Sequence, residues 1–334
     1  MTTTPSFTTT SGDIFEALGK DIAHAPISES DRVTMLRNLQ NLRNQKINLL
    51  ITGATGVGKS STINALFETE VAKVGTSPNP ETMDISKYEL GNLVIWDSPG
   101  LGDGKEADTR HAKGIISKLN EVDSKQAPLI DVVLVLVEAG SRDLGTTFEL
   151  INNIIIPNLG PNTDRLIVAL NQADQAMKGR NWDRQHNKPM PALCEFLDTQ
   201  IASVARRIKE STGVGVTPMY FSAGYKDAQE SQKPYNLSKL LYHIVKHTPS
   251  EKRVAYVDTI SRDPEMWKCD DKVKEYTKEV QATLWESVTS AASKGASIGR
   301  DIGRVFGGVG ETIGAAVGGF VGGVCGAIGS LFGW

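Results

Sequence analysis

The sequence feature that most constrains the fold is a glycine-rich stretch that directly follows an apolar run. After the run Ile47–Thr52 come Gly53-Ala54-Thr55-Gly56-Val57-Gly58-Lys59-Ser60-Ser61, and then a helical segment that reaches Phe67. The stretch matches G-x-x-x-x-G-K-[ST] in the strand–loop–helix context that this motif requires. Its glycines let the backbone form a nest of N–H donors, and the helix adds its positive N-terminal end. The stretch therefore predicts a phosphate-binding loop.

Two side chains of this loop have predicted roles. Lys59 reaches the β- and γ-phosphate oxygens of a nucleoside triphosphate, and the Ser60 hydroxyl is a ligand of Mg²⁺. An ordinary glycine-rich turn is the alternative interpretation. The flanking strand and helix favour the nucleotide site.

From residue 46 to about residue 247, strand-like runs alternate with helical segments. The runs are Ile47–Thr52, Ile85–Leu90, Leu93–Asp97, Val132–Val137, Leu166–Leu170 and Val216–Ser222. Several are apolar throughout, as is typical of strands buried on both faces. The alternation predicts an α/β fold with a mostly parallel sheet covered by helices. The second and third runs are separated by only Gly91-Asn92, so we expect them to form an antiparallel hairpin.

The residues after the fifth run indicate which base is bound. Asn171 and Asp174 lie at the carboxyl end of Leu166–Leu170, where open α/β sheets bind ligands. Guanine presents N1–H and an exocyclic amine as adjacent donors that one carboxylate can accept, whereas N1 of adenine is an acceptor. Asp174 is therefore suited to guanine, and we expect Asn171 to brace the loop and the purine. Ser222-Ala223, which ends the last run, is predicted to offer a backbone N–H to guanine O6.

The hairpin leads into candidate groups for Mg²⁺ and the γ-phosphate. Asp97-Ser-Pro-Gly100 ends its second strand. Asp97 can hold the Mg²⁺ shell through water, and the Gly100 N–H can meet the γ-phosphate; a simple Pro-Gly turn is the alternative. In the polar loop 75–82, Thr82 is the candidate for the second Mg²⁺-ligating hydroxyl, and Thr76 is the runner-up.

These motifs occur in the order of the five GTP-binding motifs of the translation-factor-related GTPases. The sequence resembles the Era-like bacterial GTP-binding proteins, in the branch described as "GTPase family protein". It is more distantly similar to the interferon-inducible GTPases, which share a GxTGxGKSS phosphate loop and helices that flank the G domain. The resemblance covers about residues 46–247. It implies a P-loop NTPase G domain with a six-stranded sheet and one antiparallel strand, Mg²⁺ dependence and slow hydrolysis of GTP to GDP.

Three positions depart from the pattern of these families. Gln172 stands where Lys usually stacks its stem on the purine, which implies weaker base affinity. Leu101 follows DSPG where Ras-type proteins place a water-orienting Gln, so backbone, another side chain or a partner must hold the attacking water. Gly56 stands where some relatives hold potassium with an Asn, so potassium dependence is not carried over.

Composition narrows the class of protein. The chain has 36 Lys and Arg against 39 Asp and Glu, a net charge of −3, which does not favour nucleic-acid binding. Its three cysteines are far apart and predict neither a disulfide framework nor a zinc site. The first residues lack the pattern of a signal peptide, so we expect a cytoplasmic protein.

Helical segments are predicted on both sides of the G domain. We divide the chain into an N-terminal helical segment (1–45), a G domain (46–249), a C-terminal helical region (250–294) and a tail (295–334). The first contains helices over 13–24 and 28–44, the second of them capped by Ser28 or Ser30. The C-terminal region is predicted as helical from 250, with an apolar stripe at Val273, Tyr276, Val280, Leu284 and Val288. His111, which follows DSPG, is interpreted as part of a solvated helix face rather than as a group near the γ-phosphate.

The tail is unusually rich in glycine. Residues 295–334 contain 14 glycines in 40 positions, most of them four residues apart, so a helix would carry them on one face as a glycine zipper. Thr312–Trp334 has no charged residue, and as a helix it would be roughly 34 Å long against a hydrocarbon core of about 30 Å. Two interpretations remain. The tail associates with a membrane, at the inner face of the cell membrane, or it packs on helices of this chain or of another copy.

The sequence supports three functional hypotheses of different classes. The first is a Mg²⁺-dependent GTPase that acts as a molecular switch; its protein partner is unknown. The second is a membrane-active or self-assembling protein in which nucleotide binding gates the tail and hydrolysis is incidental. The third, an ATP-using P-loop enzyme, is disfavoured by Asp174.

Overall fold

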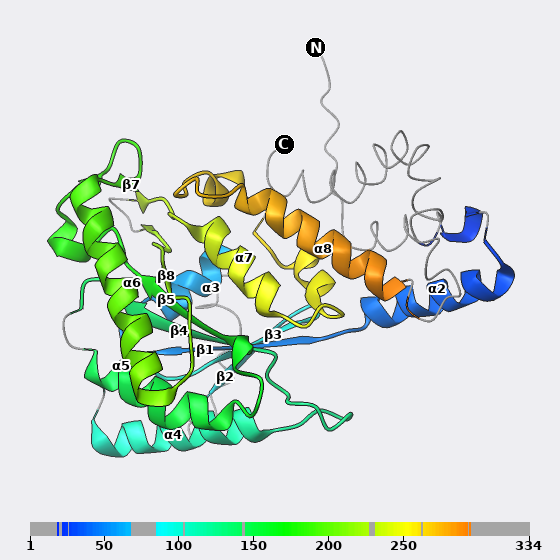
Figure 1. Cartoon of the computed structure of the whole chain (residues 1–334), viewed down its shortest axis with the longest axis horizontal. Helices are drawn as coiled ribbons and strands as arrows, with labels where there is room; N and C mark the ends of the chain where they lie inside the picture. The colour runs from blue at the N-terminus through cyan, green and yellow to red at the C-terminus, as the bar shows by residue number, and fades with distance from the viewer. Residues whose placement is uncertain are drawn as a thin grey trace, which may run out of the picture.

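A six-stranded sheet with helices on both faces forms the centre of the molecule (Figure 1). The computed structural model describes residues 19, 22–25, 27–67, 85–102, 104–141, 144–226, 231–261, 263–292 and 294. In spatial order the strands are β2 (Ser86–Leu90), β3 (Leu93–Asp97), β1 (Ile47–Gly53), β4 (Val132–Glu138), β5 (Leu166–Asn171) and β8 (Met219–Tyr220). Strand β2 is antiparallel to β3, and the other pairings are parallel. The predicted fold class, a P-loop NTPase G domain, is thereby confirmed.

The remaining elements of the described residues are helices, helical turns and two short hairpins. The α-helices are α2 (Glu29–Arg43), α3 (Lys59–Phe67), α4 (Lys105–Asn120), α5 (Gly145–Glu149), α6 (Pro191–Thr212), α7 (Leu237–His247) and α8 (Tyr276–Ala292). Helix α5 continues into a π-helical turn (Leu150–Ile155) and a 3₁₀ turn (Ile156–Asn158), and further 3₁₀ turns are Thr163–Arg165, Ala176–Gly179, Arg253–Asp258 and Pro264–Trp267. The hairpins are β6 (Trp182–Asp183) with β7 (Lys188–Pro189), and β9 (Tyr225–Lys226) with β10 (Ser231–Gln232). Among the described residues, every helix is too short or too polar to cross a bilayer.

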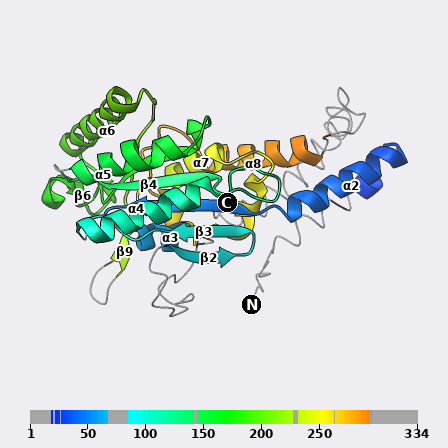
Figure 2. The same ribbon diagram turned by 90° about the horizontal axis from the view of Figure 1, so that it is seen from below.

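Alternate side chains of the central strands enter two separate apolar layers. Leu49 and Ile51 of β1 pack with α2, α3, α7 and α8, whereas Leu50 packs on the opposite face with α4 and α6. Each layer buries large aliphatic side chains, which is why these strands are apolar throughout. Helix α2 extends beyond the sheet and packs beside α8 (Figure 2). The Ser28 hydroxyl accepts a hydrogen bond from Asp31 N at 3.1 Å, so the predicted Ser28 cap is confirmed.

The predicted strands differ from the structure mainly at the last one. The hairpin around Gly91-Asn92 is present, with Leu90 opposite Leu93. The expected strand Val216–Ser222 is too long, because only Met219 and Tyr220 form β8. Strand β8 is at the edge of the sheet, and its two residues pair with Ala169 and Leu170 of β5. Ser222 pairs instead with Tyr235 in an isolated antiparallel bridge.

The predicted helix over 250–294 is wrong in its first half. Two 3₁₀ turns occupy that part, and α8 begins only at Tyr276. Pro264 lacks a backbone donor, and the Asp263 side chain accepts from Glu265 N at 2.9 Å, so local bonds replace the helix. Val273 precedes α8 and is 72% exposed. By contrast, Tyr276, Val280 and Leu284 are buried as the stripe predicts.

Several predictions lie outside the described residues. These are most of the helix over 13–24, the tail 295–334, the candidates Thr82 and Thr76, and the side chain of Val288.

Candidate functional site

The glycine-rich stretch forms the loop between β1 and α3. Gly58 has φ +86°, and a Cβ there would lie 2.5 Å from Asn171 Nδ2, so only glycine fits this close approach. Gly53 has φ +147°, and its Cβ would overlap the Leu136 carbonyl oxygen. A Cβ at Gly56 would meet open space, which leaves this side of the loop accessible.

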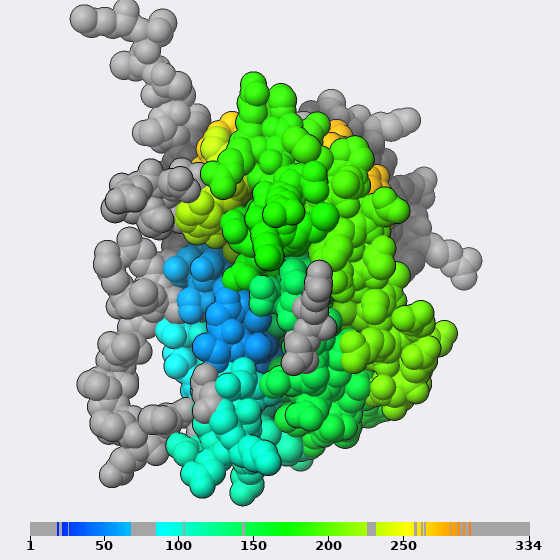
Figure 3. Space-filling view, turned by 90° about the vertical axis from the view of Figure 1, so that its left-hand side faces the viewer, coloured from blue at the N-terminus to red at the C-terminus, as the bar shows by residue number. Residues whose placement is uncertain are grey.

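Positive groups of the loop gather at the start of α3. Lys59 Nζ donates to Gly53 O and Ala54 O, both at 3.2 Å. Ser60 and Ser61 lie in the first turn of α3 and are exposed. Figure 3 shows this end of the molecule, where the blue residues of the loop and α3 reach the surface between cyan and green segments. A lysine, a helix N-terminus and loop N–H groups together favour the binding of an anion.

Asn171 joins three segments of the site. It ends β5 and is 1% exposed. Its Nδ2 donates to Val57 O at 2.8 Å, and its Oδ1 accepts from Ala223 N at 3.0 Å. Gln172 adds a second link to the phosphate loop, because its Nε2 donates to Gly56 O at 2.8 Å. The end of β5 is thus tied to the phosphate loop on one side and to the loop after β8 on the other.

The two N–H groups proposed for guanine O6 both have partners. Ala223 N–H donates to Asn171 Oδ1, and Ser222 N–H donates to Tyr235 O at 2.9 Å. A contact with O6 would therefore be shared with Asn171 or would replace one of these bonds. The Ser222 side chain has a role that the sequence analysis missed: its Oγ donates to Asp174 Oδ1 at 2.5 Å. The order of the motifs gives no signal for this bond.

Asp174 is held at the wall of a cavity. It is 5% exposed, and Gln175 Nε2 donates to its Oδ2 at 2.6 Å. The cavity has a volume of about 360 Å³ and is lined by Gly58, Ser61, Asn171, Gln172, Asp174, Gln175, Ser222, Ala223, Gly224 and Tyr225. Both the phosphate loop and the predicted base acceptor therefore line one cavity. Each carboxylate oxygen that already accepts one bond retains capacity to accept another.

Asp97 ends β3 with an unsatisfied carboxylate oxygen. Its Oδ1 is buried and has no hydrogen-bond partner in the described structure. Burial raises the pKa of Asp97 to about 6, and nearby Lys59 acts in the opposite direction. A buried oxygen without a partner is costly unless a cation or a donor meets it. Carboxylate and hydroxyl oxygens are also the ligands that Mg²⁺ prefers, so Asp97 and Ser60 fit this ion.

The segment after Asp97 lies directly on the phosphate loop. Thr55 N donates to Leu101 O at 3.1 Å, and Ala54 and Leu101 form a parallel bridge. Gly100 is so close to Thr55 that a Cβ would overlap the Thr55 side chain and backbone. Leu101 is only 4% exposed and packs in the apolar layer that contains α4.

The prediction that His111 belongs to a solvated helix face is wrong. His111 is 5% exposed, and its Nδ1 donates to Gly100 O at 3.1 Å. It therefore fixes the Gly100 peptide from α4. The spacing His111, Ile115, Leu119 carried the signal, because residues four apart share one helix face and all three are buried.

The chain is similar to several known proteins. Residues 48–172 match the profile of a family described as 50S ribosome-binding GTPase. The uncharacterized protein YfjP of Escherichia coli K12 is 29% identical over 147 residues, which cover 43% of this chain and 47% of that protein. Translocase of chloroplast 34 of Pisum sativum is 27% identical over 178 residues, which cover 52% of this chain and 56% of that protein. Each match spans less than two thirds of the relative's own length.

A solved structure gives a more distant likeness. Toc33 from Arabidopsis thaliana, in complex with GDP and Mg²⁺, is 15% identical, with a TM-score of 0.42 over 69% of this chain and 95% of that one. The profile match includes the phosphate loop, Asp97 and Asn171. This part of the chain has the fold of a P-loop NTPase G domain and matches the profile of a GTPase family.

Proposed function

We propose that the protein binds GTP with Mg²⁺, hydrolyses it to GDP and acts as a molecular switch of the Era-like kind. The observation that carries the proposal is the single cavity shared by the phosphate loop and by Asp174. In it, Asp174 accepts the two adjacent donors of guanine. Lys59, the loop N–H groups and the start of α3 bind the phosphates.

Mg²⁺ is held by Ser60 and Asp97 in this proposal, with Thr82 as the further candidate from the sequence. When bound, the ion neutralises charge on the phosphate oxygens. The chain's own groups do the rest. Lys59 and the backbone donors stabilise the charge that develops on the γ-phosphate, and the Gly100 N–H contacts it.

Slow intrinsic turnover is part of the proposal. Leu101 has no polar atom in its side chain and is buried in an apolar layer, so it cannot orient the attacking water. His111 is committed to Gly100 O through Nδ1. A partner that supplies a water-orienting group would accelerate the reaction.

Displacement of a fluorescent guanine nucleotide tests the proposal. GTP and GDP should displace it from the wild type in the presence of Mg²⁺, whereas ATP should not. Lys59→Ala should lose GTP turnover, measured as released phosphate. Equal displacement by ATP and GTP would support an ATP-using enzyme and contradict the proposal.

We further propose that residues 295–334 associate with a membrane, at the inner face of the cell membrane, or with helices of another copy. The support is the spacing of the glycines and the place where the tail begins. Asn38 Nδ2 of α2 donates to the Lys294 carbonyl oxygen at 2.7 Å, so the residue that precedes the tail lies beside α2. Flotation with liposomes should require residues 295–334. In a nucleotide-gated protein, flotation should also differ between GDP and a non-hydrolysable GTP analogue.

A further inference from the structure

The loop that carries Ser222, a hydrogen-bond donor to Asp174, has little support from the sheet. It follows β8, which has only two residues and pairs only with the end of β5. Its second support is Tyr235, which exchanges two backbone hydrogen bonds with Ser222, both at 2.9 Å. Ser222 in turn donates to Asp174. Tyr235 therefore contributes to the position of the base acceptor, beside the bond from Ala223 N to Asn171 Oδ1.

Asn236, the residue after Tyr235, is anchored from several directions. It is fully buried and has φ +56°, a conformation that Asn tolerates better than most residues. Its Nδ2 donates to Tyr220 O at 3.0 Å, and its Oδ1 accepts from Asp271 N at 2.8 Å. Its own N–H donates to Cys269 O at 2.8 Å. One side chain thus joins β8 to the segment that precedes α8.

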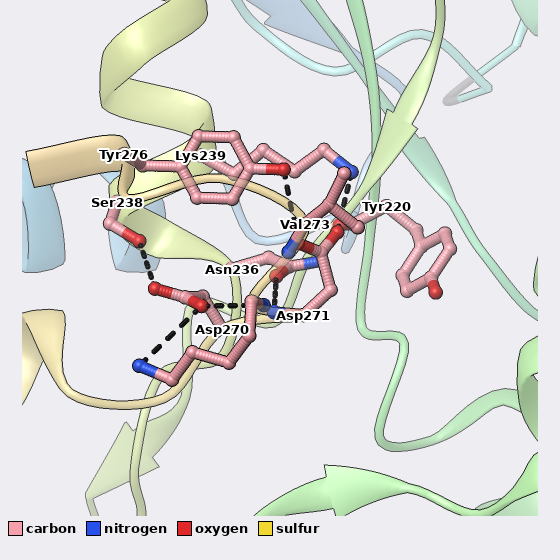
Figure 4. A network of polar contacts seen from close by, with 9 residues as sticks. Tyr220, Asn236, Ser238, Lys239, Asp270, Asp271, Val273 and Tyr276 are labelled. Carbon is pink, nitrogen blue, oxygen red and sulfur yellow. Dashed lines mark hydrogen bonds and ion pairs between the residues drawn. The ribbon is translucent and has the colours of Figure 1, made fainter. Parts of the chain in front are cut away.

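Asp271 ties this segment to two helices (Figure 4). Its Oδ2 accepts from Lys239 Nζ of α7 at 2.6 Å, and its Oδ1 accepts from Tyr276 OH of α8 at 3.0 Å. Val273 N also donates to Oδ1, at 3.1 Å. The neighbouring Asp270 accepts from Ser238 Oγ at 3.1 Å. The segment is therefore bonded to α7 and α8 as well as to Asn236.

We propose that Asn236 and Asp271 are positioning residues for the base-binding loop. The segment before α8 supports the selection of guanine through Asn236, Tyr235 and Ser222, without contact with the nucleotide. The proposal rests on the proposed function, because it assumes that Asp174 binds the base. It predicts that changes about 50–100 positions away in the sequence alter base selectivity.

The first test replaces Asn236 by glycine, which keeps the positive φ and removes both side-chain bonds. Inosine diphosphate lacks the 2-amino group that Asp174 accepts, so the affinity ratio of GDP to inosine diphosphate reports how well Asp174 is placed. Loss of two buried hydrogen bonds should weaken GDP binding about tenfold and lower this ratio at least threefold. Calorimetric titration of the full chain with Mg²⁺ measures both quantities.

A purely structural role makes a different prediction. It would lower the melting temperature of Asn236→Gly but leave the ratio at its wild-type value, and that result would overturn the proposal. If Asn236→Gly does not fold, Asp271→Ala replaces it as the test variant, because the backbone N–H of residue 271 can still donate to Asn236 Oδ1. We expect its ratio to fall about twofold, since the segment loses the bonds that Asp271 accepts from Lys239 of α7 and Tyr276 of α8. An unchanged ratio in Asp271→Ala would equally overturn the proposal.

The control is Glu275→Gln, which removes an exposed ion pair with Lys278 from the same segment. It should leave both affinities unchanged, and a lowered ratio in this variant would contradict the specific route through Asn236. Coupling is reciprocal, so GDP should also slow hydrogen exchange at the amides of Asp271 and the first turns of α8. If the wild type binds no GDP, the proposed function fails. If the wild type binds GDP and the variants keep its selectivity, only the present inference fails.

Discussion

At the scale of single residues, the site depends on side chains that bond to backbone groups of other segments. Asn171 is the main example, because its amide meets Val57 O and Ala223 N. His111 is another, since its ring holds Gly100 O. Such bonds fix the spacing between loops.

Replacing Asn171 by alanine should disconnect the phosphate loop from the loop after β8. Two buried backbone groups lose their partners, which should lower the free energy of unfolding by about 2–4 kcal/mol. Nucleotide affinity should fall at least about tenfold for the same reason. Urea unfolding and calorimetry measure the two effects. Asn120→Ala, at an exposed asparagine on α4, should stay within about 1 kcal/mol of wild type, and an equal loss in both variants would contradict the bridging role.

Gly100→Ala should push the segment after β3 away from the phosphate loop. The new Cβ would overlap Thr55, so the bond from Thr55 N to Leu101 O should break. We expect GTP turnover to fall at least about tenfold, because a shift of about 1 Å misplaces the γ-phosphate contact. Gly215→Ala is the matched control, since a Cβ there meets open space without a positive φ. Wild-type turnover in Gly100→Ala would show that this close approach is dispensable.

At the scale of elements, α7 carries a partly buried histidine among cations. Burial lowers the pKa of His243 to about 4, with further lowering by His247, Lys239, Lys246 and Lys274. In the unfolded chain its pKa stays at about 6.5. Below pH 6.5 the unfolded state therefore binds a proton that the folded state does not. The contribution of neutral His243 to the free energy of unfolding is therefore complete above pH 6.5 and is lost as the pH falls toward 4.

His243→Gln should remove this pH dependence. Between pH 7.5 and pH 4.5 the wild type should lose about 2 kcal/mol more of its free energy of unfolding than the variant does. Urea denaturation of both proteins at the two pH values gives the difference directly. An equal loss of the free energy of unfolding in both proteins would show that His243 also binds a proton in the folded protein over this pH range.

Helices and strands could be predicted where the local sequence pattern favours the same element as the packing against neighbouring elements. The hairpin β2–β3 followed from Gly91-Asn92 between two apolar runs, and α2 followed from its apolar spacing and Ser28. The length predicted for the strand Val216–Ser222 was wrong, because β8 pairs only with Ala169 and Leu170 of β5. The sequence of the run itself does not show which residues of the neighbouring strand are available for pairing. The helix predicted from 250 failed because Pro264 and Asp263 favour local turns over the apolar pattern.

At the scale of the whole molecule, one apolar layer joins segments from both ends of the described chain. Met35 and Leu39 of α2, the β1 face with Leu49, and Leu284 of α8 belong to the same cluster. The helices that flank the G domain therefore share its core. We expect them to unfold together with the sheet in one transition.

Leu284→Ala tests this shared core. Leu284 is 1% exposed, so its truncation should lower the free energy of unfolding by about 2–4 kcal/mol and shift the single transition as a whole. Val273→Ala, at a side chain that is 72% exposed, should change it by less than about 0.5 kcal/mol. A separate early transition for α8 in the Leu284 variant would indicate independent folding.

The long-range part of the site was beyond sequence reasoning. The position of the phosphate loop, Asp97, Asn171 and Asp174 at or just after the ends of strands could be predicted, because the motifs occur in a known order. The bond between Asn236 and Asp271 could not, since neither residue lies in a motif and their pairing depends on how α8 packs. The burial of His111 could have been predicted from its spacing with Ile115 and Leu119, but the polar residues around it favoured an exposed helix face.

The proposed function depends most on Asp174, which accepts the two adjacent donors of guanine in that proposal. Xanthine carries a carbonyl at C2 where guanine has an amine, and an asparagine at 174 offers an N–H donor to that carbonyl. Calorimetric titration of wild type and Asp174→Asn with GDP and xanthosine diphosphate, in Mg²⁺, tests the claim most directly. The wild type should prefer GDP, and the variant should lose GDP affinity by about a hundredfold while it gains affinity for xanthosine diphosphate. Undiminished GDP binding by Asp174→Asn, or no GDP binding by the wild type, would contradict it.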